Sequence, residues 1–533
     1  MNNPPKTALV TIHVEANSLA FPLAAAQLKA ALPKGLSKNT DIKDFYLAQK
    51  PSVIAEELAK TEYDAIGFSS YIWNARQVRE TAELLKKANP KLIIIAGGPH
   101  VSAMPDFFLK DDLFDFLIKN EGEYALEKAI GSEPQEKTVV LDGPRVNMET
   151  LASPFLSGAI NTDNYDGVLW ELSRGCPYNC AFCYEARNHG FVRRFPMSRL
   201  AEELKLFIKK GVREVWILDS TFNHDEKWCT AFLEMLAEEA PHIHFTFEIR
   251  AERVTEQQAR LFGKLVASLQ IGLQSSNPEV MARLNRPFKP QNYKKKIRLL
   301  EQNYLVYGFD LIYGLPGDTL ESFKESLDYT LTLSPSNIDI FRLSLLPGTE
   351  LDDRAEEFGI VHDGSYERLV VGRPGFTDED LEEAEDLTEL CDFFYTKGLA
   401  SIWFKTACDA LELTPSFFLE RFGIWLEQND FDREDLADLD PAPLQKEFLE
   451  FCFSWRNKKE LYLPLESYIL WHEGLNMIME GEEERIVELN YDPDSLTQLD
   501  VIGLANFATY FPPTPQNWRI FTEENNVYWE PIV

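Results

Sequence analysis

Cysteine is scarce in this 533-residue chain, and the first of its seven cysteines is Cys176. Three of them share one short loop and four stand singly, so they form no disulfide framework and indicate reducing surroundings. No apolar run approaches the roughly 20 residues that a membrane span needs. The chain also does not open with a charged, apolar and small-residue signal. We therefore expect a cytoplasmic protein without a membrane span.

Positive charge is scarce as well, since 53 Lys and Arg stand against 86 Asp and Glu, a net charge of −33. The deficit is uneven: from Leu351 onward there are 41 acidic and 13 basic residues, which accounts for −28. Such a surface repels phosphate backbones, so we expect no direct nucleic-acid binding. A solvated acidic face that keeps the protein soluble is the simplest explanation. The length predicts about three domains.

Strand-like and helix-like patterns alternate in the first segment, which we bound at residues 1–145. Apolar runs of buried-strand type alternating with amphipathic segments predict an α/β, doubly wound parallel sheet whose ligand lies beyond the carboxyl ends of the strands. The loops at those ends read SSYIWN from Ser69, AGGPHVS from Ala96 and NEGEYAL from Asn120. The expected strands are 8–14, 41–47, 65–71, 92–96 and 114–119, and the expected helices are 19–31, 53–59 and 76–88.

A connector at 146–165 leads to a second run of strand and helix patterns at 166–350. Six repeated units predict a partial (β/α)6 barrel with its site at the carboxyl ends of the strands. The remainder, 351–533, has periodic apolar faces and predicts a mainly α-helical, acidic C-terminal domain. Its frequent aromatic residues favour a packed core over a substrate site. The expected barrel strands are 168–172, 214–218, 244–249, 268–273, 306–312 and 337–343, and the C-terminal helices are 378–397, 402–411, 415–427, 444–455 and 465–479.

The sequence ELSRGCPYNCAFCY, from Glu171, carries the clearest chemical signal. Cys176, Cys180 and Cys183 follow a C-x3-C-x2-C spacing directly after an apolar strand. Three thiolates can hold three irons of a four-iron cluster and leave the fourth iron open to another ligand. Buried cysteines or a zinc site are the alternatives. Zinc needs a fourth Cys or His nearby, and the nearest candidate is His189 in an Arg-rich segment.

This motif resembles that of the radical S-adenosylmethionine enzymes, whose open iron chelates S-adenosylmethionine. The resemblance implies further contacts at strand ends. Phe182 is similar to the aromatic residue against adenine, and Gln274, in IGLQSSNPEVMARLNRP, lies where the ribose or methionine carboxylate is bound. Arg250 would pair with that carboxylate. The second-strand motif departs from the family, since ILDSTFN leaves the amino-group contact to Asp219 or to backbone. Tyr313 to Leu315, in DLIYGLPGDT, would follow the adenine edge through backbone.

The first segment resembles the cobalamin-binding domain of cobalamin-dependent radical enzymes. Families that bind cobalt through a protein imidazole carry Asp-x-His-x-x-Gly after the first strand, whereas this chain reads HVEANSLA from His13. We therefore expect no axial histidine, with Trp73 nearest the vacated face of cobalt. A degenerate domain that binds nothing is the alternative. The resemblance assigns cobalamin contacts to Ser69, Ser70, Tyr71, Trp73, Asn74, Gly97, Gly98, Pro99 and His100.

The whole layout resembles a group of cobalamin-binding radical S-adenosylmethionine proteins with a helical C-terminal domain. It implies three cofactors: a 4Fe-4S cluster, S-adenosylmethionine and cobalamin. The expected activity is methyl transfer through methylcobalamin to an unactivated carbon, after hydrogen abstraction by a 5′-deoxyadenosyl radical. A small-molecule or peptide substrate and an external reductant of flavodoxin or ferredoxin type are implied. The alternatives are radical oxidation, cyclisation or rearrangement without methyl transfer, and a corrinoid or iron–sulfur sensor or carrier. A methylthiotransferase would need further cysteines before Cys176.

Overall fold

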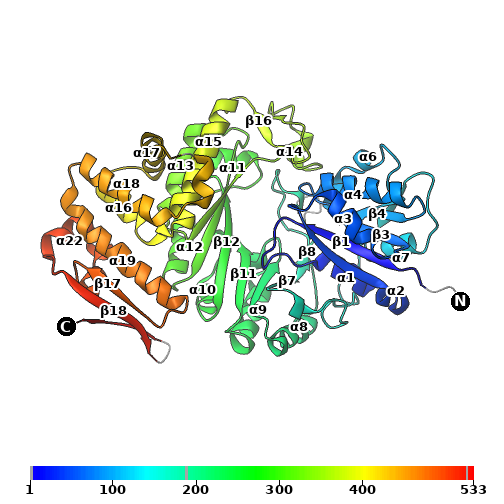
Figure 1. Ribbon diagram of the computed structural model, residues 1–533, viewed down its shortest axis with the longest axis horizontal. Coiled ribbons are helices and arrows are strands. Elements are labelled where there is room, and N and C mark those ends of the chain that lie inside the picture. The colour runs from blue at the N-terminus through cyan, green and yellow to red at the C-terminus, as the bar shows by residue number, and fades with distance from the viewer. Residues whose placement is uncertain (1–3, 186–189, 432, 524–525, 533) are drawn as a thin grey trace.

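The computed structural model describes residues 4–185, 190–431, 433–523 and 526–532. Three lobes follow one another along the molecule, with the N-terminal sheet at one end, a larger parallel sheet in the middle and a helical lobe at the other end (Figure 1). Within the described residues no helix is long and apolar enough to cross a membrane.

The N-terminal lobe is a six-stranded parallel sheet in the order β2-β1-β3-β4-β5-β6. Helices α3 and α4 pack on one face, and α1 and α7 pack on the other, so the predicted doubly wound sheet is confirmed. The strands are β1 (Thr7–His13), β2 (Thr40–Tyr46), β3 (Ala65–Ser69), β4 (Ile93–Gly97), β5 (Phe116–Asn120) and β6 (Val139–Gly143), and the helices are α1 (Leu23–Ala31), α2 (Lys34–Lys38), α3 (Pro51–Ala59), α4 (Ala75–Ala88), α5 (Pro99–Ala103), α6 (Pro105–Phe108) and α7 (Ala125–Ile130).

Two details of this lobe differ from the sequence prediction. Strand β6 (Val139–Gly143) was not expected, because its apolar run is only three residues long and its side chains alternate between partly buried and exposed, as in an edge strand. Helix α1 begins at Leu23 and not at 19, since Pro22 precedes it and the preceding residues form a loop. That loop matters for function, because it reaches the carboxyl edge of the sheet.

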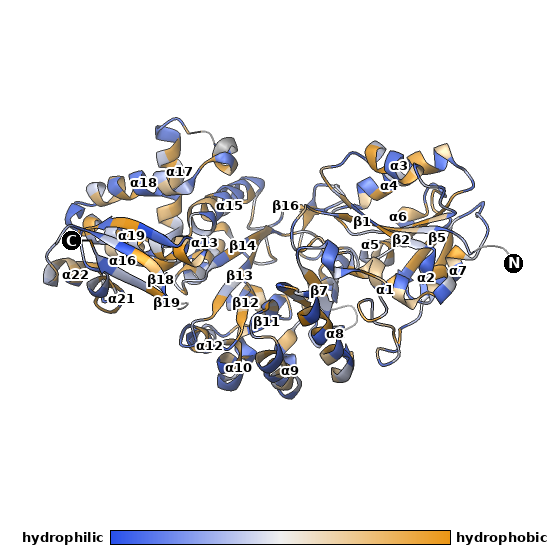
Figure 2. Ribbon diagram, turned by 60° about the horizontal axis from the view of Figure 1, so that its bottom comes forward, coloured by the Kyte–Doolittle hydropathy of each residue, from blue (hydrophilic) through white to orange (hydrophobic). Residues whose placement is uncertain are grey.

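The middle lobe contains six parallel strands in the order β14-β13-β12-β11-β10-β7, and its two edge strands do not pair with each other. The predicted partial barrel is therefore confirmed. Helices cover its outer side with polar faces toward solvent (Figure 2). The elements are β7 (Val168–Glu171), α8 (Met197–Lys210), β10 (Glu214–Leu218), α9 (Glu226–Glu239), β11 (His244–Ile249), α10 (Glu256–Phe262), β12 (Val266–Gln274), α11 (Pro278–Arg283), α12 (Pro290–Glu301), β13 (Val306–Tyr313), α13 (Leu320–Leu331) and β14 (Asn337–Arg342), with a small hairpin of β8 (Ser173–Arg174) and β9 (Arg193–Arg194).

The C-terminal lobe is mainly helical, as predicted, but it ends in an antiparallel sheet that was not expected. Strands β17 (Glu484–Leu489), β18 (Gln516–Glu523) and β19 (Asn526–Pro531) form that sheet. Its strands mix polar and apolar residues and lack the long apolar runs of the two parallel sheets. The other elements are α14 (Glu350–Asp353), β15 (Val361–His362), β16 (Val370–Gly372), α15 (Asp378–Cys391) with a π-helical end at Asp392–Lys397, α16 (Phe404–Leu411), α17 (Pro415–Gln428), α18 (Pro441–Trp455), α19 (Tyr462–Met479), α20 (Pro493–Leu496), α21 (Leu499–Ile502) and α22 (Leu504–Tyr510).

The aromatic residues of this lobe form a packed core, as their helical spacing predicts. Phe394 has four aromatic neighbours within 6.0 Å between ring centroids, among them Trp403, Phe404 and Phe418. Edge-to-face pairs of this kind add to the stabilisation from burial alone. Phe417, Trp455, Tyr510 and Tyr528 are exposed and do not belong to this core.

Candidate functional site

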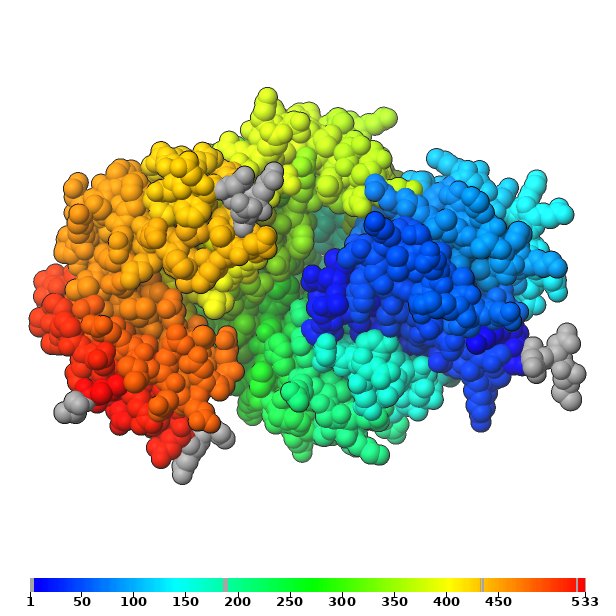
Figure 3. All heavy atoms as spheres, viewed as in Figure 1, coloured from blue at the N-terminus to red at the C-terminus, as the bar shows by residue number. Residues whose placement is uncertain are grey.

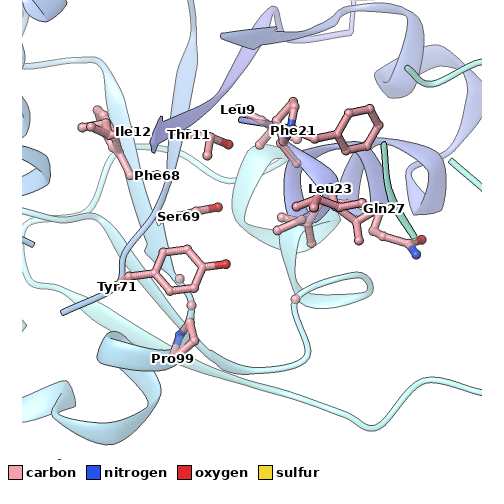
Figure 4. A pocket seen from close by; sticks show the side chains of 18 of the residues that line it. Leu9, Thr11, Ile12, Phe21, Leu23, Gln27, Phe68, Ser69, Tyr71 and Pro99 are labelled. Carbon is pink, nitrogen blue, oxygen red and sulfur yellow. The ribbon is translucent and has the colours of Figure 1, made fainter. Parts of the chain in front are cut away.

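A cavity of about 780 Å³ opens at the carboxyl edge of the N-terminal sheet. Its walls are the ends of β1, β3 and β4, the loop before α1, helix α1 itself and the loop after β5. The side-chain oxygens of Thr11, Ser69 and Tyr71 all point across it toward α1 (Figure 4). Burial, with Glu171 nearby, raises the pKa of Tyr71. Its hydroxyl therefore stays protonated and available as a donor.

Glycine is required where β4 runs into α5. Gly98 has φ +106°, and a Cβ atom there would lie 2.6 Å from the carbonyl oxygen of Ser70. No other residue type adopts this conformation in that space. The resulting turn exposes backbone at the floor of the cavity, where a large planar ligand can approach closely.

Six of the nine expected cobalamin contacts line this cavity, and three do not. Ser70 is buried beneath it. The Asn74 side chain instead holds the loop, since its Nδ2 donates to the carbonyl oxygens of Ile12 at 3.2 Å and Ser69 at 3.1 Å. His100 is buried against Phe107 and Phe108. The residues that line it are Ser69, Tyr71, Trp73, Gly97, Gly98 and Pro99.

The residues on the wall opposite the glycine turn were not predicted from the sequence. Phe21, Leu23 and Gln27 come from the loop before α1 and from α1, and they lie opposite the glycine turn. Thr11 Oγ1 and Gln27 Oε1 are buried without a hydrogen-bond partner among the described residues. Unsatisfied polar atoms in an otherwise apolar cavity fit a ligand with amide groups at its rim. The corrin ring of cobalamin, which carries amide side chains, suits this lining.

His13 also lines the cavity, but its imidazole is already engaged. Nε2 lies 2.9 Å from Oδ1 of Asp44, and the ring lies 5.9 Å from that of Tyr46. An imidazole fixed in this way serves the pairing of β1 with β2. His13 therefore has a structural role at the end of β1.

A second, smaller pocket of about 150 Å³ lies at the carboxyl ends of the barrel strands. The three cysteines of the Cys176–Cys183 loop all line it, together with residues from β11, β12 and β13. Cys176 and Cys180 are buried, and Cys183 is partly exposed. His189, the candidate fourth zinc ligand, lies outside the described residues. Within the described part of the chain no group of three or more His, Cys, Asp and Glu side chains converges on a single metal ion.

The backbone before the first cysteine also requires glycine. Gly175 has φ +94°, and a Cβ atom there would lie 2.2 Å from the carbonyl oxygen of Phe191. The chain therefore leaves β8 in a backbone conformation that glycine alone adopts easily. This turn directs Cys176 back toward the barrel, where its Sγ lies 3.9 Å from Oγ1 of Thr221.

Two guanidinium groups approach the Cys180 thiol. Arg250 Nη2 donates to its Sγ at 3.3 Å, and Arg286 Nη1 donates to the same atom at 3.8 Å. Arg250 also stacks on Tyr178, with 3.6 Å from Cζ to the ring centroid. Charged donors of this kind stabilise a thiolate, which is the form that binds iron. The thiol chemistry and these donors fit an iron–sulfur cluster.

Polar groups from three neighbouring strands line the rest of this pocket. Gln270 Nε2 donates to Asp310 Oδ1 at 2.5 Å and to Asp339 Oδ2 at 2.8 Å. Burial, with Asp310 nearby, raises the pKa of Glu248 to about 7. Burial likewise raises the pKa of Asp310 to about 6. Water reaches the Glu248 carboxylate from the pocket, although protein surrounds it on most sides.

The structure separates the six expected S-adenosylmethionine contacts into two groups. Phe182, Arg250 and Gln274 line the pocket, and Gln274 Oε1 is buried without a partner among the described residues. Asp219, Tyr313 and Leu315 do not line it. Asp219 is buried and accepts a hydrogen bond from the Thr221 backbone N–H at 3.3 Å. Tyr313 packs against Phe323, and Leu315 belongs to an apolar cluster behind the Cys176–Cys183 loop.

Two pocket residues that sequence reasoning missed are Glu248 and Arg286. Glu248 lies two residues before Arg250, and Arg286 lies inside IGLQSSNPEVMARLNRP, which was singled out for Gln274. Side chains alternate between the two faces along a strand, so residues two apart face the same side. Glu248 therefore faces the same side as Arg250, and this spacing could have identified it from the sequence. Arg286 follows a helix, and its contact with Cys180 depends on the fold of the loop.

Residues that are close in sequence line the two cavities at two strand ends. Glu171 of β7 and Arg174 of β8 line the larger cavity, and Cys176, two residues after Arg174, lines the smaller one. From β10, Leu218 lines the larger cavity, and Ser220 lines the smaller one. The molecular surface is hollowed between the N-terminal lobe and the C-terminal lobe, with the barrel at its floor (Figure 3).

Ion pairs and a hydrogen bond join the N-terminal lobe to the barrel beside this junction. Arg174 lies 2.8 Å from Glu171 within the barrel and 2.7 Å from Glu123 of the N-terminal lobe. Arg193 pairs with Glu121, and Gln27 Nε2 donates to Glu171 at 3.2 Å. Both Glu171 and Glu123 are shielded from solvent, so Arg174 compensates charges that would otherwise be buried alone.

Two family profiles match the parts of the chain in which the two cavities lie. A family profile described as the B12 binding domain matches residues 9–130, and one described as the Radical SAM superfamily matches residues 170–330. The cobalamin-dependent radical SAM methyltransferase TokK of Streptomyces tokunonensis is 27% identical over 369 residues, covering 62% of this chain and 54% of that protein. The 2-(S-pantetheinyl)-carbapenam-3-carboxylate methyltransferase of Streptantibioticus cattleyicolor is 28% identical over 374 residues, with the same coverage.

Among solved structures, the cobalamin-dependent S-adenosylmethionine radical enzyme OxsB, with aqua-cobalamin and S-adenosylmethionine bound, has a similar fold. The TM-score is 0.57 at 16% identity, and the likeness covers 95% of this chain and 83% of that one. The chain spans about half the length of the two curated methyltransferases that it matches.

Proposed function

Because this chain is a cobalamin-binding radical S-adenosylmethionine protein, we propose that it is a methyltransferase that transfers a methyl group to an unactivated carbon. Both curated relatives that it matches over 62% of its length carry the name methyltransferase. When bound, the cluster with S-adenosylmethionine supplies a 5′-deoxyadenosyl radical that takes a hydrogen atom from substrate, and cobalamin supplies the carrier of the methyl group. The protein contributes binding, orientation and exclusion of water.

The observation that carries this proposal is that residues only two positions apart line the two cavities. Arg174 lines one and Cys176 lines the other, and Leu218 and Ser220 repeat this arrangement on the neighbouring strand. A substrate at this junction faces both cofactor sites at once. Hydrogen abstraction and methyl delivery need that proximity, because both act on the same carbon atom.

In the smaller pocket, the carboxylate and the amino group of S-adenosylmethionine each find a side chain of opposite charge. We assign the methionine carboxylate to the guanidinium of Arg286, which suits a planar carboxylate. We assign the amino group to Glu248 and the ribose hydroxyls to Asp310, with Gln274 as a further contact. This assignment replaces Asp219, whose carboxylate does not line the pocket. Arg250 remains with Cys180 and Tyr178 as a support for the cluster loop.

In the larger cavity, the glycine turn at Gly97 and Gly98 and the apolar side chains of α1 would hold the faces and edge of cobalamin. Tyr71, Thr11 and Gln27 offer polar atoms to its amide groups. Residues 146–165 would connect the cobalamin-binding domain at 1–145 to the barrel at 166–350, with the acidic domain at 351–533 beyond. These boundaries remain our proposal.

We further propose a small-molecule or peptide substrate, an external reductant of flavodoxin or ferredoxin type and a cytoplasmic location. Radical oxidation, cyclisation or rearrangement without methyl transfer is the second candidate, since it would use the same two cavities. A methylthiotransferase is less well supported, because the first cysteine is Cys176 and the N-terminal lobe has none. A sensor or carrier would not need the ionic partners that line the smaller pocket.

One experiment separates these candidates. Anaerobically reconstituted protein is supplied with cobalamin, reductant and S-adenosylmethionine carrying a deuterated methyl group, together with metabolite extract. Formation of 5′-deoxyadenosine together with a product heavier by one labelled methyl group supports the proposal. Formation of 5′-deoxyadenosine with a product of unchanged carbon count favours rearrangement or oxidation. A chain that forms no 5′-deoxyadenosine with a fully loaded cluster is a sensor or carrier.

A further inference from the structure

A strongly basic segment stands out in this acidic chain. Residues 280–300 include seven Lys and Arg and no Asp or Glu, in a protein whose net charge is −33. The segment spans the end of α11, the following loop and most of α12. Its basic residues are Arg283, Arg286, Lys289, Lys294, Lys295, Lys296 and Arg298.

This segment packs directly on the Cys176–Cys183 loop. The Ala181 backbone N–H donates to the Leu284 carbonyl at 3.0 Å, and Asn285 Nδ2 donates to the Asn179 carbonyl at 3.2 Å. Arg286 reaches the Cys180 thiol from the same stretch. Any molecule that rests on the segment is therefore close to the loop that holds the cluster.

The outer cations of the segment have no acidic partners. Arg283, Lys289, Lys294, Lys295 and Arg298 are exposed, and none of them forms an ion pair with another described residue. Lys324 of α13, in contrast, pairs with both Glu383 and Glu420. Five exposed cations in one stretch that contains no Asp or Glu make this surface locally positive on a protein with 33 excess negative charges, which suits an anionic partner.

The basic surface continues to the exposed tip of the cluster loop. Lys296 Nζ donates to the Val254 carbonyl at 2.6 Å, which joins α12 to the turn at Ala251–Arg253. Arg253 is exposed, and its Nε donates to the Tyr178 hydroxyl at 3.0 Å. Two carboxylates beside this surface are already paired, Glu252 with Arg250 and Glu350 with Arg354.

We propose that Arg253, Arg283, Lys289, Lys294, Lys295 and Arg298 form the docking surface for a small acidic electron-carrier protein of the flavodoxin class. The inference rests on the proposed function, because that function needs an external one-electron donor. Each docking passes one electron from the reduced flavin of the carrier to the cluster, so the carrier is oxidised by one electron and no atom is transferred. Elsewhere the negative net charge repels an acidic carrier, so this surface orients the encounter.

The test compares two variants of equal charge change. One carries Lys294→Glu, Lys295→Glu and Arg298→Glu, and the control carries Lys205→Glu, Lys209→Glu and Lys227→Glu on α8 and α9. All six side chains are exposed, and none of them forms an ion pair with a described residue. Binding of oxidised bacterial flavodoxin is measured by calorimetry at low salt. We expect binding to weaken roughly tenfold in the first variant and to stay within about twofold of the wild type in the control.

Equal binding by the wild type and the first variant would overturn the docking surface, and so would equal loss in both variants. Loss of transfer RNA binding in the first variant, with flavodoxin binding kept, would instead assign the surface to nucleic acid. Binding is measured without turnover, so it does not depend on methyl transfer. If dithionite-driven reactions give no methylated product while flavodoxin binding is lost only in the first variant, the docking surface stands and the proposed function fails.

Discussion

The two parallel sheets carry their cavities at the same kind of edge, but the two cavities differ in construction. The cavity at the N-terminal sheet is about 780 Å³ and mainly apolar, whereas the pocket at the barrel is about 150 Å³ and is lined by thiols, carboxylates and guanidinium groups. The shape of the larger cavity determines which ligand fits it, whereas the charged side chains of the smaller pocket determine which ligand binds there. Substitutions in the pocket should therefore act strongly and specifically, and those in the apolar cavity should act weakly.

The largest effect is expected in the cluster loop. Replacing Cys176, Cys180 and Cys183 together by Ala should remove all bound iron after anaerobic reconstitution, because each thiolate holds one iron of the cluster. Iron and sulfide analysis measures this result. In the matched control, Cys229, Cys391, Cys408 and Cys452 are each replaced by Ala, and iron content should stay unchanged. Full iron content in the triple variant would contradict the assignment.

The next largest effect concerns the junction between the two cavities. Arg174→Ala should lower the free energy of unfolding by about 3–5 kcal/mol, because it leaves Glu171 and Glu123 shielded from solvent without their cation. Urea unfolding followed by fluorescence gives the shift of the first transition. Arg354→Ala is the control, since Arg354 pairs with Glu350 and Glu357 at the surface and its loss should change little. Equal midpoints for the two variants would show that the junction is not held by Arg174.

A smaller effect is expected for Glu248 and is visible as a pH dependence. Burial raises the pKa of Glu248 to about 7, so the carboxylate is mostly neutral at pH 6 and mostly charged at pH 8. If the charged form binds the amino group, affinity for S-adenosylmethionine should rise roughly tenfold from pH 6 to pH 8. Asp310, Asp219 and Glu185 contribute to the raised pKa, because their negative charges disfavour ionisation of Glu248.

Glu248→Gln should bind S-adenosylmethionine weakly at every pH and lose this dependence. Glu214→Gln is a matched control, because Glu214 lies at the amino end of β10, away from the pocket. Calorimetric titration of the reconstituted protein measures both. A Glu248→Gln profile that keeps the wild-type rise would assign the pH dependence to another group.

Most of the fold was predictable because its parallel strands are buried on both faces and read as apolar runs. Strands β10 and β11 agree with the sequence prediction residue for residue, Glu214–Leu218 and His244–Ile249. Strand β6 and the C-terminal sheet were missed because their apolar residues are interrupted by polar ones and form no long apolar run. An edge strand is stabilised by its neighbour, which a local pattern does not record.

The candidate site was predictable where a motif fixes it and not where the fold brings distant residues together. Cys176, Cys180 and Cys183 follow from their spacing. Arg286 does not, because it lies 106 positions after Cys180 and only the fold brings the two together. Asn74 and His100 lie in the expected loops, but one caps a turn and the other fills a core. Proximity to a motif therefore identifies loops better than individual contacts.

The smallest effect is expected at Trp73, which is largely exposed at the rim of the apolar cavity. Its ring stacks on Tyr71, with centroids 4.4 Å apart and an angle of 13° between the planes. Trp73→Ala removes this stack, which is worth about 0.5–1.5 kcal/mol, so cobalamin affinity should fall by only a few-fold. Leu84→Ala, an exposed position on α4, is the control and should leave affinity unchanged.

The same cavity allows a second measurement, which reports whether a protein imidazole binds cobalt and does not depend on cobalamin affinity. Because His13 is held by Asp44 and His100 is buried away from the cavity, no imidazole should bind cobalt in the cob(II)alamin form. An axial nitrogen would split each cobalt line of the paramagnetic resonance spectrum into three. We expect unsplit lines in the wild type, in His13→Ala and in Trp73→Ala alike, since none of these changes supplies or removes a ligand. Threefold splitting that disappears in His13→Ala would mean that cobalamin draws the imidazole away from Asp44, and the apolar cavity would then select by coordination as well as by shape.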